Sequence, residues 1–232
     1  EFKNAKGRDG RRAFAIPMEL SSRDLEWRQL DQIPFSQWLN DNGFTAPSLH
    51  WLANYATRDD YGTAHTQTSA WAGLHYFACR NGEAANASAD TVLTAPDGNA
   101  WLMRGLAASA SGRIVSGALV WRIEEGKQSV TVDALIKKKT VRFEARQIIW
   151  AAPAFILPRV WPAMPGELRS AALAGDYAPW LTANLHLADF PEERRGAAPA
   201  WDNVFYDSPG LGYVTATHQL IRRRLTGTVF TY

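Results

Sequence analysis

Residues 144–157, EARQIIWAAPAFIL, contain the pattern that decides the fold expected of this chain. A polar lead-in is followed by Ile148, Ile149 and Trp150, then by Ala151, Ala152 and Pro153. A short, β-branched apolar run that ends at a proline predicts a buried strand whose end turns into a loop or helix. Two alanines at such an end would let a large group approach the backbone closely. Taken alone, however, Ala-Ala-Pro is more often an ordinary end to a strand.

Further strands are expected on both sides of this stretch. Upstream, apolar and polar residues alternate at 114–123 and 130–134, and the three lysines at 137–139 suit a polar hairpin connection. A short strand is also expected at 91–94. Downstream, alternation or β-branched runs predict strands at 181–187, 204–206, 212–217 and 229–231.

Helices dominate the first 80 residues. Serine pairs or a first-turn proline precede apolar residues at helical spacing, and glycines follow them. These signals predict helices at 21–31, 35–41, 47–57 and 70–80, and similar patterns predict helices at 101–108, 154–159 and 166–174. The sequence therefore favours a helical cap joined to sheet-forming segments.

Two features with chemical potential each have an ordinary interpretation. Asp59 and Asp60 could serve in metal binding or acid–base catalysis, but no His or Glu cluster accompanies them, and Asp-Asp before Gly62 favours a plain turn. His75 lies four residues after Trp71, beside an apolar helix face. A lone histidine there is more often a hydrogen-bonded boundary residue than a general base.

Composition excludes several classes of protein. A net charge of +2 with only short basic clusters is unlike a nucleic-acid-binding surface, and there is no apolar run of about 18 residues to span a membrane. One cysteine rules out an internal disulfide framework, and no metal cluster is recognisable. Ten tryptophans spread along the chain suit both a packed core and a pocket for a flat ligand.

Several segments occur in an order that resembles a known family. They are DDYG at 59–62, SAWAGLHYFA at 69–78, PDGNAWL at 96–102, the stretch 144–157, APWLTANLHL at 178–187 and WDNVFYDSPGLGYVTATHQ at 201–219. Their colinear series resembles the flavin-containing amine oxidoreductases, which include monoamine oxidases, phytoene desaturases and protoporphyrinogen oxidases, and in particular bacterial FAD-dependent members. No single segment is specific; the resemblance covers roughly residues 14–232.

The resemblance implies an α+β fold: a helical cap plus a mixed β-sheet substrate domain, with a β-hairpin segment from an FAD-binding domain. Residues 1–90 would be the helical cap and substrate region, 91–153 would return to the FAD-binding domain, and 154–232 would form substrate-domain helices and sheet. The backbone around Val120 would meet the adenine of FAD, and Ala151, Ala152 and Pro153 would border its ribose and pyrophosphate. Candidate substrate-pocket residues are Tyr61, Trp71, His75, Tyr206, Tyr213 and His218, although packing roles suit each of them equally.

One departure from that family affects every functional expectation. The GxGxxG turn that receives the FAD pyrophosphate at a helix N-terminus is absent from these 232 residues. We therefore expect an internal piece of a longer flavoprotein that by itself is inactive and does not retain FAD. The expected function is the substrate-binding portion of an FAD-dependent oxidoreductase that transfers a hydride from a C–N or C–C bond to the flavin. No particular catalytic residue is predicted, and no metal.

A second class remains open: a non-catalytic, aromatic-rich binding domain that shares only the architecture of flavoproteins. In either case the expected partner is a small molecule, either apolar or an amine, rather than nucleic acid. Exposed strand edges would also favour self-association. The localisation stays open between cytoplasm and periplasm, because the native N-terminus is expected to be missing.

Overall fold

The computed structural model describes residues 2–80, 85–86, 94–96, 98–192, 195–196, 200–224 and 226–232. Contacts within the chain divide it into two compact units. One unit combines Glu1–Gly98 with Ala178–Tyr232, and the other is Asn99–Tyr177. The expected strand at 91–94 and turn at 96–98 fall largely outside the described residues. The three functional segments expected from the sequence stay a prediction.

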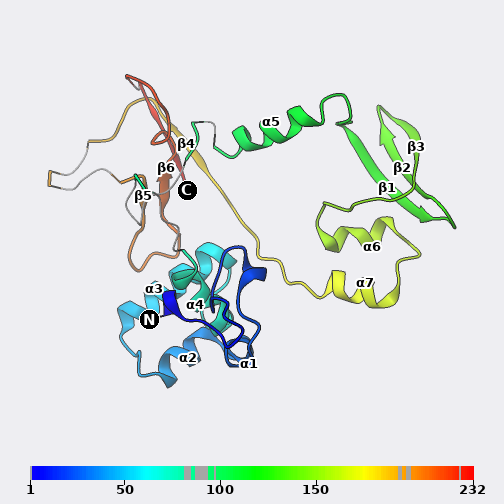
Figure 1. The fold of residues 1–232 in the computed structure, drawn as a ribbon. Helices are drawn as coiled ribbons and strands as arrows, with labels where there is room; N and C mark the ends of the chain where they lie inside the picture. The colour runs from blue at the N-terminus through cyan, green and yellow to red at the C-terminus, as the bar shows by residue number, and fades with distance from the viewer. Residues whose placement is uncertain are drawn as a thin grey trace. The chain divides into compact units, whose positions relative to one another are not determined.

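Helices α2, α3 and α4 of the first unit begin at the expected residues, whereas the first helix, α1, begins at Leu25 rather than directly after the serine pair. Pro47 occupies the first turn of α3, and Gly62, with φ of 66°, ends that helix in the left-handed conformation that glycine adopts without strain. The Ser69 hydroxyl accepts a hydrogen bond from the Ala72 amide and caps α4. The elements are η1 (Phe2–Asn4), η2 (Met18–Leu20), α1 (Leu25–Arg28), η3 (Gln29–Gln32), α2 (Phe35–Asp41), α3 (Pro47–Tyr61) and α4 (Ala70–Ala78) (Figure 1).

A core of aromatic residues and alanines holds these helices together. Phe14 is 1% exposed, and its ring lies 5.7 Å from those of both Trp27 and Trp71. Gly73 on α4 permits close approach by Phe35, because a Cβ at this position would collide with the Phe35 ring. The rest of the buried cluster consists of Ala13, Leu39, Ala53, Ala70, Leu74, Ala78 and Cys79.

A four-stranded sheet completes the first unit. Its strands are β4 (Asn184–Leu187), β5 (Asp202–Asn203), β6 (Tyr213–Thr215) and β7 (Thr228–Thr231), in the order β4-β7-β6-β5. Every pair is antiparallel among the described residues, so the mixed sheet expected from the sequence is wrong in this detail. The α+β class itself is confirmed. The strands are short because glycines and turns interrupt the segments between them.

The second unit places helices beside a three-stranded antiparallel sheet with the order β1-β2-β3. The Lys137-Lys138 connection adopts positive φ angles of 48° and 65° at its two residues, which gives the tight hairpin turn between β2 and β3. Helix α6 contacts β1, on whose inner face Ile123 is buried (Figure 1). The elements are α5 (Ala100–Ser109), β1 (Ala118–Glu125), β2 (Val130–Ile136), β3 (Lys139–Ala145), η4 (Ala154–Ile156), α6 (Leu157–Val160) and α7 (Gly166–Leu173).

The opposite face of this sheet carries a buried carboxylate. Asp133 on β2 accepts two hydrogen bonds from the Arg142 guanidinium on the neighbouring strand, each 2.7 Å long. The hydrogen bond from Arg142 is the main reason that the pKa of Asp133 is lowered. The paired charges let an otherwise apolar strand carry an aspartate at a buried position.

The buried strand predicted at residues 148–150 is wrong. Strand β3 ends at Ala145, and residues 147–150 have no regular secondary structure. Ile149 is 94% exposed. An apolar run becomes a buried strand only when neighbouring strands supply hydrogen bonds on its edges, and the described residues of this unit supply none to this segment.

No helix among the described residues is long and apolar enough to cross a membrane.

Candidate functional site

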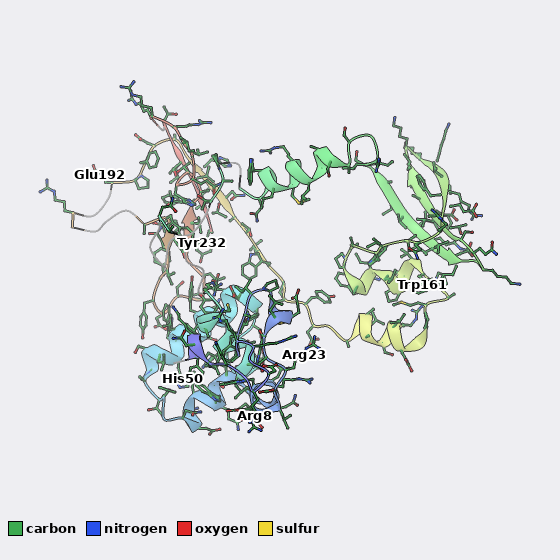
Figure 2. All side chains as sticks on the ribbon, viewed as in Figure 1. Arg8, Arg23, His50, Trp161, Glu192 and Tyr232 are labelled. Atoms are coloured by element: carbon green, nitrogen blue, oxygen red, sulfur yellow. The ribbon has the colours of Figure 1, made fainter. Side chains whose placement is uncertain are left out.

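A cavity of about 650 Å³ lies within the first unit, between the C-terminal half of α3 and the four-stranded sheet. Aromatic rings and carboxylates share its lining. The helix contributes Tyr55, Arg58, Asp59 and the capping Gly62. The other side consists of residues 179–182, Trp201, Asp202, residues 209–214, Thr231 and Tyr232, the last of which is labelled in Figure 2.

Helical spacing explains which residues of α3 line the cavity. Tyr55, Asp59 and Gly62 follow one another at intervals of four and three residues, so they lie on one face of the helix. Gly62 also lies so close to Ala178 that a Cβ on the glycine would collide with that residue. The plain turn expected at Asp59 and Asp60 is wrong, because both residues belong to the last turns of α3.

The two neighbouring aspartates have different surroundings. Arg80 donates from one guanidinium nitrogen to both carboxylate oxygens of Asp60, at 3.2 Å each, and lies 4.5 Å above the Tyr76 ring. Asp59 forms no ion pair with any described residue. Asp60 therefore has an ion-pair partner, whereas Asp59 is a half-buried carboxyl group on the cavity wall with no ion pair among the described residues.

Burial and negative charge act together on this wall. The pKa of Asp59 is raised, first by burial and then by the charges of Asp60 and Asp202, which together outweigh the opposing charge of Arg80. The pKa of Tyr55 is raised to about 12 by burial and by the charges of Asp59 and Asp202. The negative charge of Asp59 is thus unfavourable in the ligand-free protein, and a cation bound beside Asp59 and Asp202 would relieve it.

The sheet side of the cavity is built from aromatic residues held by packing. Tyr213 on β6 stacks on Phe230 of β7, with ring centroids 4.4 Å apart. Gly212, with φ of 99°, approaches the Asn203 carbonyl so closely that a Cβ would collide with it. The loop before β6 is thereby held against β5, which carries Asp202 into the lining. Each side of the cavity thus contributes a carboxylate and at least one aromatic ring, a combination suited to a small cation with an apolar body.

Of the six predicted substrate-pocket residues, Tyr213 lines this cavity. Tyr206 is exposed, and its ring lies tilted against that of Trp51 with centroids 4.5 Å apart. Trp51 borders an adjoining smaller hollow with Asp207. His218 is exposed and stacks at 5.2 Å on Trp201, a residue of the main lining.

The other three predicted residues belong to the helical core. The Tyr61 hydroxyl donates to the Ala72 carbonyl at 2.8 Å, and the pKa of Tyr61 is raised to about 12, mainly by burial. His75 stacks on Trp71, and its Nε2 donates to the Ala15 carbonyl at 2.9 Å. Trp71 itself borders a separate surface hollow near α1.

The predicted cofactor-binding residues all lie in the second unit. Val120 is followed by a break in the β1–β2 register, between Val120 and Arg122, and the intervening Trp121 is partly exposed. Ala151, Ala152 and Pro153 are exposed and follow β3 without regular structure. Helix α6, which begins four residues after Pro153, contacts β1, the strand that carries Val120.

Sequence reasoning missed several residues of the cavity. Asp59 was interpreted as part of a turn, and Tyr55, Asp202, Trp180 and Tyr232 were not singled out. The spacing of Tyr55, Asp59 and Gly62 on one helix face was available as a signal. The position of Asp202 was not, because it depends on a sheet partner far away in the chain. No group of three or more potential metal ligands occurs among the described residues.

Comparisons with known proteins bear on the fold. No protein-family model and no curated protein matches the chain. Among solved structures, wild-type putrescine oxidase bound to putrescine matches with a TM-score of 0.54 and 18% identity, over 71% of this chain and 36% of that one. A single mutant of putrescine oxidase, from work on redesigned cofactor binding, gives a TM-score of 0.53 and 16% identity over 72% and 37% of the two chains. The chain thus matches little more than a third of putrescine oxidase, and at this identity the likeness concerns the fold.

Proposed function

We propose that this chain supplies the substrate-binding portion of a flavin-dependent oxidoreductase that acts on an amine. The unit formed by residues 1–98 and 178–232 would bind the substrate, and the unit 99–177 would form part of the FAD site. The observation that carries the proposal is the cavity in which the carboxyl groups of Asp59 and Asp202 lie among aromatic rings, with the pKa of Asp59 raised. The fold likeness to putrescine oxidase and the order of the sequence segments support it.

The lining of the cavity suits a protonated amine. An ammonium group would place its N–H donors against the carboxylates of Asp59 and Asp202, and charge-assisted hydrogen bonds of this kind are stronger than neutral ones. The rings of Trp201, Tyr213 and Tyr232 would cover its methylene groups and exclude water. Arg58, also in the lining, donates its guanidinium hydrogen bond to the Pro209 carbonyl. That bond holds the side chain against the turn before β6.

In the proposed FAD site, the backbone around Val120 would meet the adenine, and Ala151, Ala152 and Pro153 would border the ribose and pyrophosphate. Recognition by main-chain groups needs backbone that small side chains leave open, and exposed Ala151, Ala152 and Pro153 provide such backbone. The register break after Val120 interrupts the β1–β2 ladder at the other predicted contact. The glycine turn for the pyrophosphate is not among these residues, so this chain would hold only part of the cofactor. When bound, the flavin supplies the hydride acceptor.

The substrate-binding role is tested by titrating the purified protein with putrescine and, as a matched control, with the diol of the same length. Both compounds have the same apolar body, but only the diamine carries charge. We expect calorimetry to detect binding of putrescine and at least roughly tenfold weaker binding of the diol, because each hydrogen bond to a charged group is worth about 1.5–3 kcal/mol. Equal affinities for putrescine and the diol would show that the carboxylates do not take part in binding. Preference for the diol would instead favour the non-catalytic aromatic binding domain.

We also expect the protein to self-associate through strand edges. The strands β1 and β3 form the two edges of the three-stranded sheet, and Leu119, Val141 and Phe143 on them are partly exposed. Open edges with apolar side chains favour pairing with another chain. Light scattering over a wide concentration range should therefore show mass increasing with concentration. A constant monomer mass across that range would contradict this expectation.

A further inference from the structure

Two histidines contact each other beside α3, outside the cavity. His50 lies in the first turns of that helix, and His65 lies in the loop that follows its end. The His50 Nδ1 and the His65 Nε2 are 3.2 Å apart, and the two rings meet edge to face. Both side chains are half-buried. Figure 2 labels His50 among the helices at the N-terminal end of the chain.

The outer nitrogen of each ring faces an acceptor. The His50 Nε2 lies 2.8 Å from the Phe44 carbonyl oxygen, which can only accept. The His65 Nδ1 lies 3.2 Å from the Asn54 Oδ1. The backbone amide of His65 donates to the same Oδ1 at 3.3 Å, which fixes the oxygen, rather than the amide nitrogen of Asn54, on this side. Both outer ring nitrogens must therefore carry hydrogen.

This arrangement determines the number of protons on the pair. A neutral imidazole has one N–H, and here each ring uses it on the outer nitrogen. Two neutral rings would then turn lone pairs toward each other across 3.2 Å. One additional proton between the rings converts this repulsion into an N–H···N hydrogen bond. A second additional proton would place two N–H groups and two positive charges face to face.

We propose that His50 and His65 share a single proton and act as a pH-sensitive clasp, which holds the loop at residues 62–69 against α3. The same loop receives hydrogen bonds from the Ser36 and Phe35 amides at the start of α2. It begins at Gly62, which lines the candidate cavity. Opening the clasp would therefore loosen the loop next to Asp59 without altering any cavity side chain.

The surroundings favour a shared proton over a metal ion. No group of three or more potential ligands occurs in the described part of the chain, so a metal would have only two protein ligands here. Among ionisable groups, only His50 acts with burial to lower the pKa of His65. The charged groups of the last turns of α3 belong elsewhere: Arg58 and Asp59 line the cavity, and Asp60 is paired with Arg80.

The clasp should open in both directions of pH. Burial and the charge of His50 lower the pKa of His65 in the folded protein. The stabilising contribution of neutral His65 is therefore present above the ordinary histidine pKa of about 6.5. It is lost as the pH falls through the lowered pKa of the folded protein. At higher pH, loss of the shared proton returns the opposed lone pairs. We therefore expect the protection of the loop amides against hydrogen exchange to be greatest at a pH between two titration steps.

Nitrogen-detected NMR of the imidazoles across a pH series tests this directly. We expect the hydrogen-bonded pair of rings to take up protons as one unit, in two macroscopic steps. Hydrogen-exchange protection of the His65 amide should be greatest between those steps. In His50→Gln and His65→Gln, the remaining histidine should titrate in one step. The matched control His218→Gln, at an exposed histidine bonded to the Thr215 carbonyl, should keep the two-step behaviour.

Independent, single-step titration of both histidines in the unaltered protein would overturn the proposal, whether or not the variants fold. If hydrogen-exchange protection of the His65 amide did not change with pH through both steps, the proton would not control the loop. That result would overturn the proposal that the histidine pair holds the loop against α3. These readouts depend on neither flavin nor substrate, so a failure of the proposed function leaves them unaffected.

Discussion

Replacing Asp59 by asparagine is expected to have opposite effects on ligand binding and on stability. Putrescine binding should weaken by roughly 10- to 100-fold, because a charged hydrogen bond worth about 1.5–3 kcal/mol is lost. The free protein should become more stable at neutral pH. The raised pKa of Asp59 means that its ionised form is disfavoured in the folded state, and the substitution removes that ionised form. Calorimetry with putrescine and thermal unfolding without it measure the two effects.

The sign of the pH dependence follows from the same carboxyl group. With a folded pKa above the unfolded value, Asp59 penalises the folded state at high pH, and the penalty disappears as pH falls through the raised value. The stability gained by Asp59→Asn should therefore be greatest at neutral pH and disappear in acid. Putrescine binding to the unaltered protein should weaken over the same acidic range, as the carboxylate becomes protonated.

Asp60→Asn provides the matched control, since it makes the same chemical change one residue away. Asp60 is compensated by Arg80, and this pair is partly exposed, so its loss should cost no more than about 1 kcal/mol of stability. Putrescine affinity should change much less than in Asp59→Asn. If the two variants lose equal affinity, or if Asp59→Asn destabilises the free protein, the assignment of Asp59 as the ligand-binding carboxylate with a raised pKa is wrong.

Phe14→Ala is expected to be the most destabilising single change in the helical part of the first unit. Phe14 is 1% exposed and contacts the rings of Phe2, Trp27 and Trp71, which lie on three different helices. Truncation of a buried phenylalanine costs about 3–5 kcal/mol through lost transfer energy and the cavity that remains. Urea unfolding followed by tryptophan fluorescence would measure the change in the free energy of unfolding.

The comparison variant is Ile149→Ala, which removes an apolar side chain that is 94% exposed. Exposed substitutions usually change stability by less than about 0.5 kcal/mol. A loss of several kcal/mol for Ile149→Ala would show that residues 147–150 are buried in solution, as the sequence pattern suggested. A loss below about 1 kcal/mol for Phe14→Ala would contradict the aromatic core.

The sequence predicted those elements whose signals are local. Pro47 begins α3, Ser69 caps α4, and apolar runs marked β1 and β2. Each of these signals acts through backbone geometry or hydrogen bonds within a few residues. The α+β class followed from them without knowledge of any distant contact. The end of α3 at Gly62 was missed, because residues 59–62 have the composition of a turn.

The failures concern features that depend on distant partners. The run Ile148–Trp150 has the composition of a buried strand, but a strand also needs neighbours, and here Ile149 is exposed. The sheet order β4-β7-β6-β5 brings Asp202 to the wall opposite Asp59, and no spacing along the chain could indicate that meeting. Tyr213, a candidate taken from the family resemblance, lines the cavity. His75 and Tyr61 instead bond to backbone carbonyls of other segments.

The most direct test of the proposed function is the absorption spectrum of the full gene product, purified without added flavin, followed by anaerobic addition of putrescine. We expect flavin bands that bleach when the amine is added, because the substrate would pass a hydride to a flavin held partly by the unit 99–177. A colourless protein that also fails to bind added FAD would contradict the assignment to flavin-dependent oxidoreductases. The non-catalytic aromatic binding domain would then be the better explanation of the cavity.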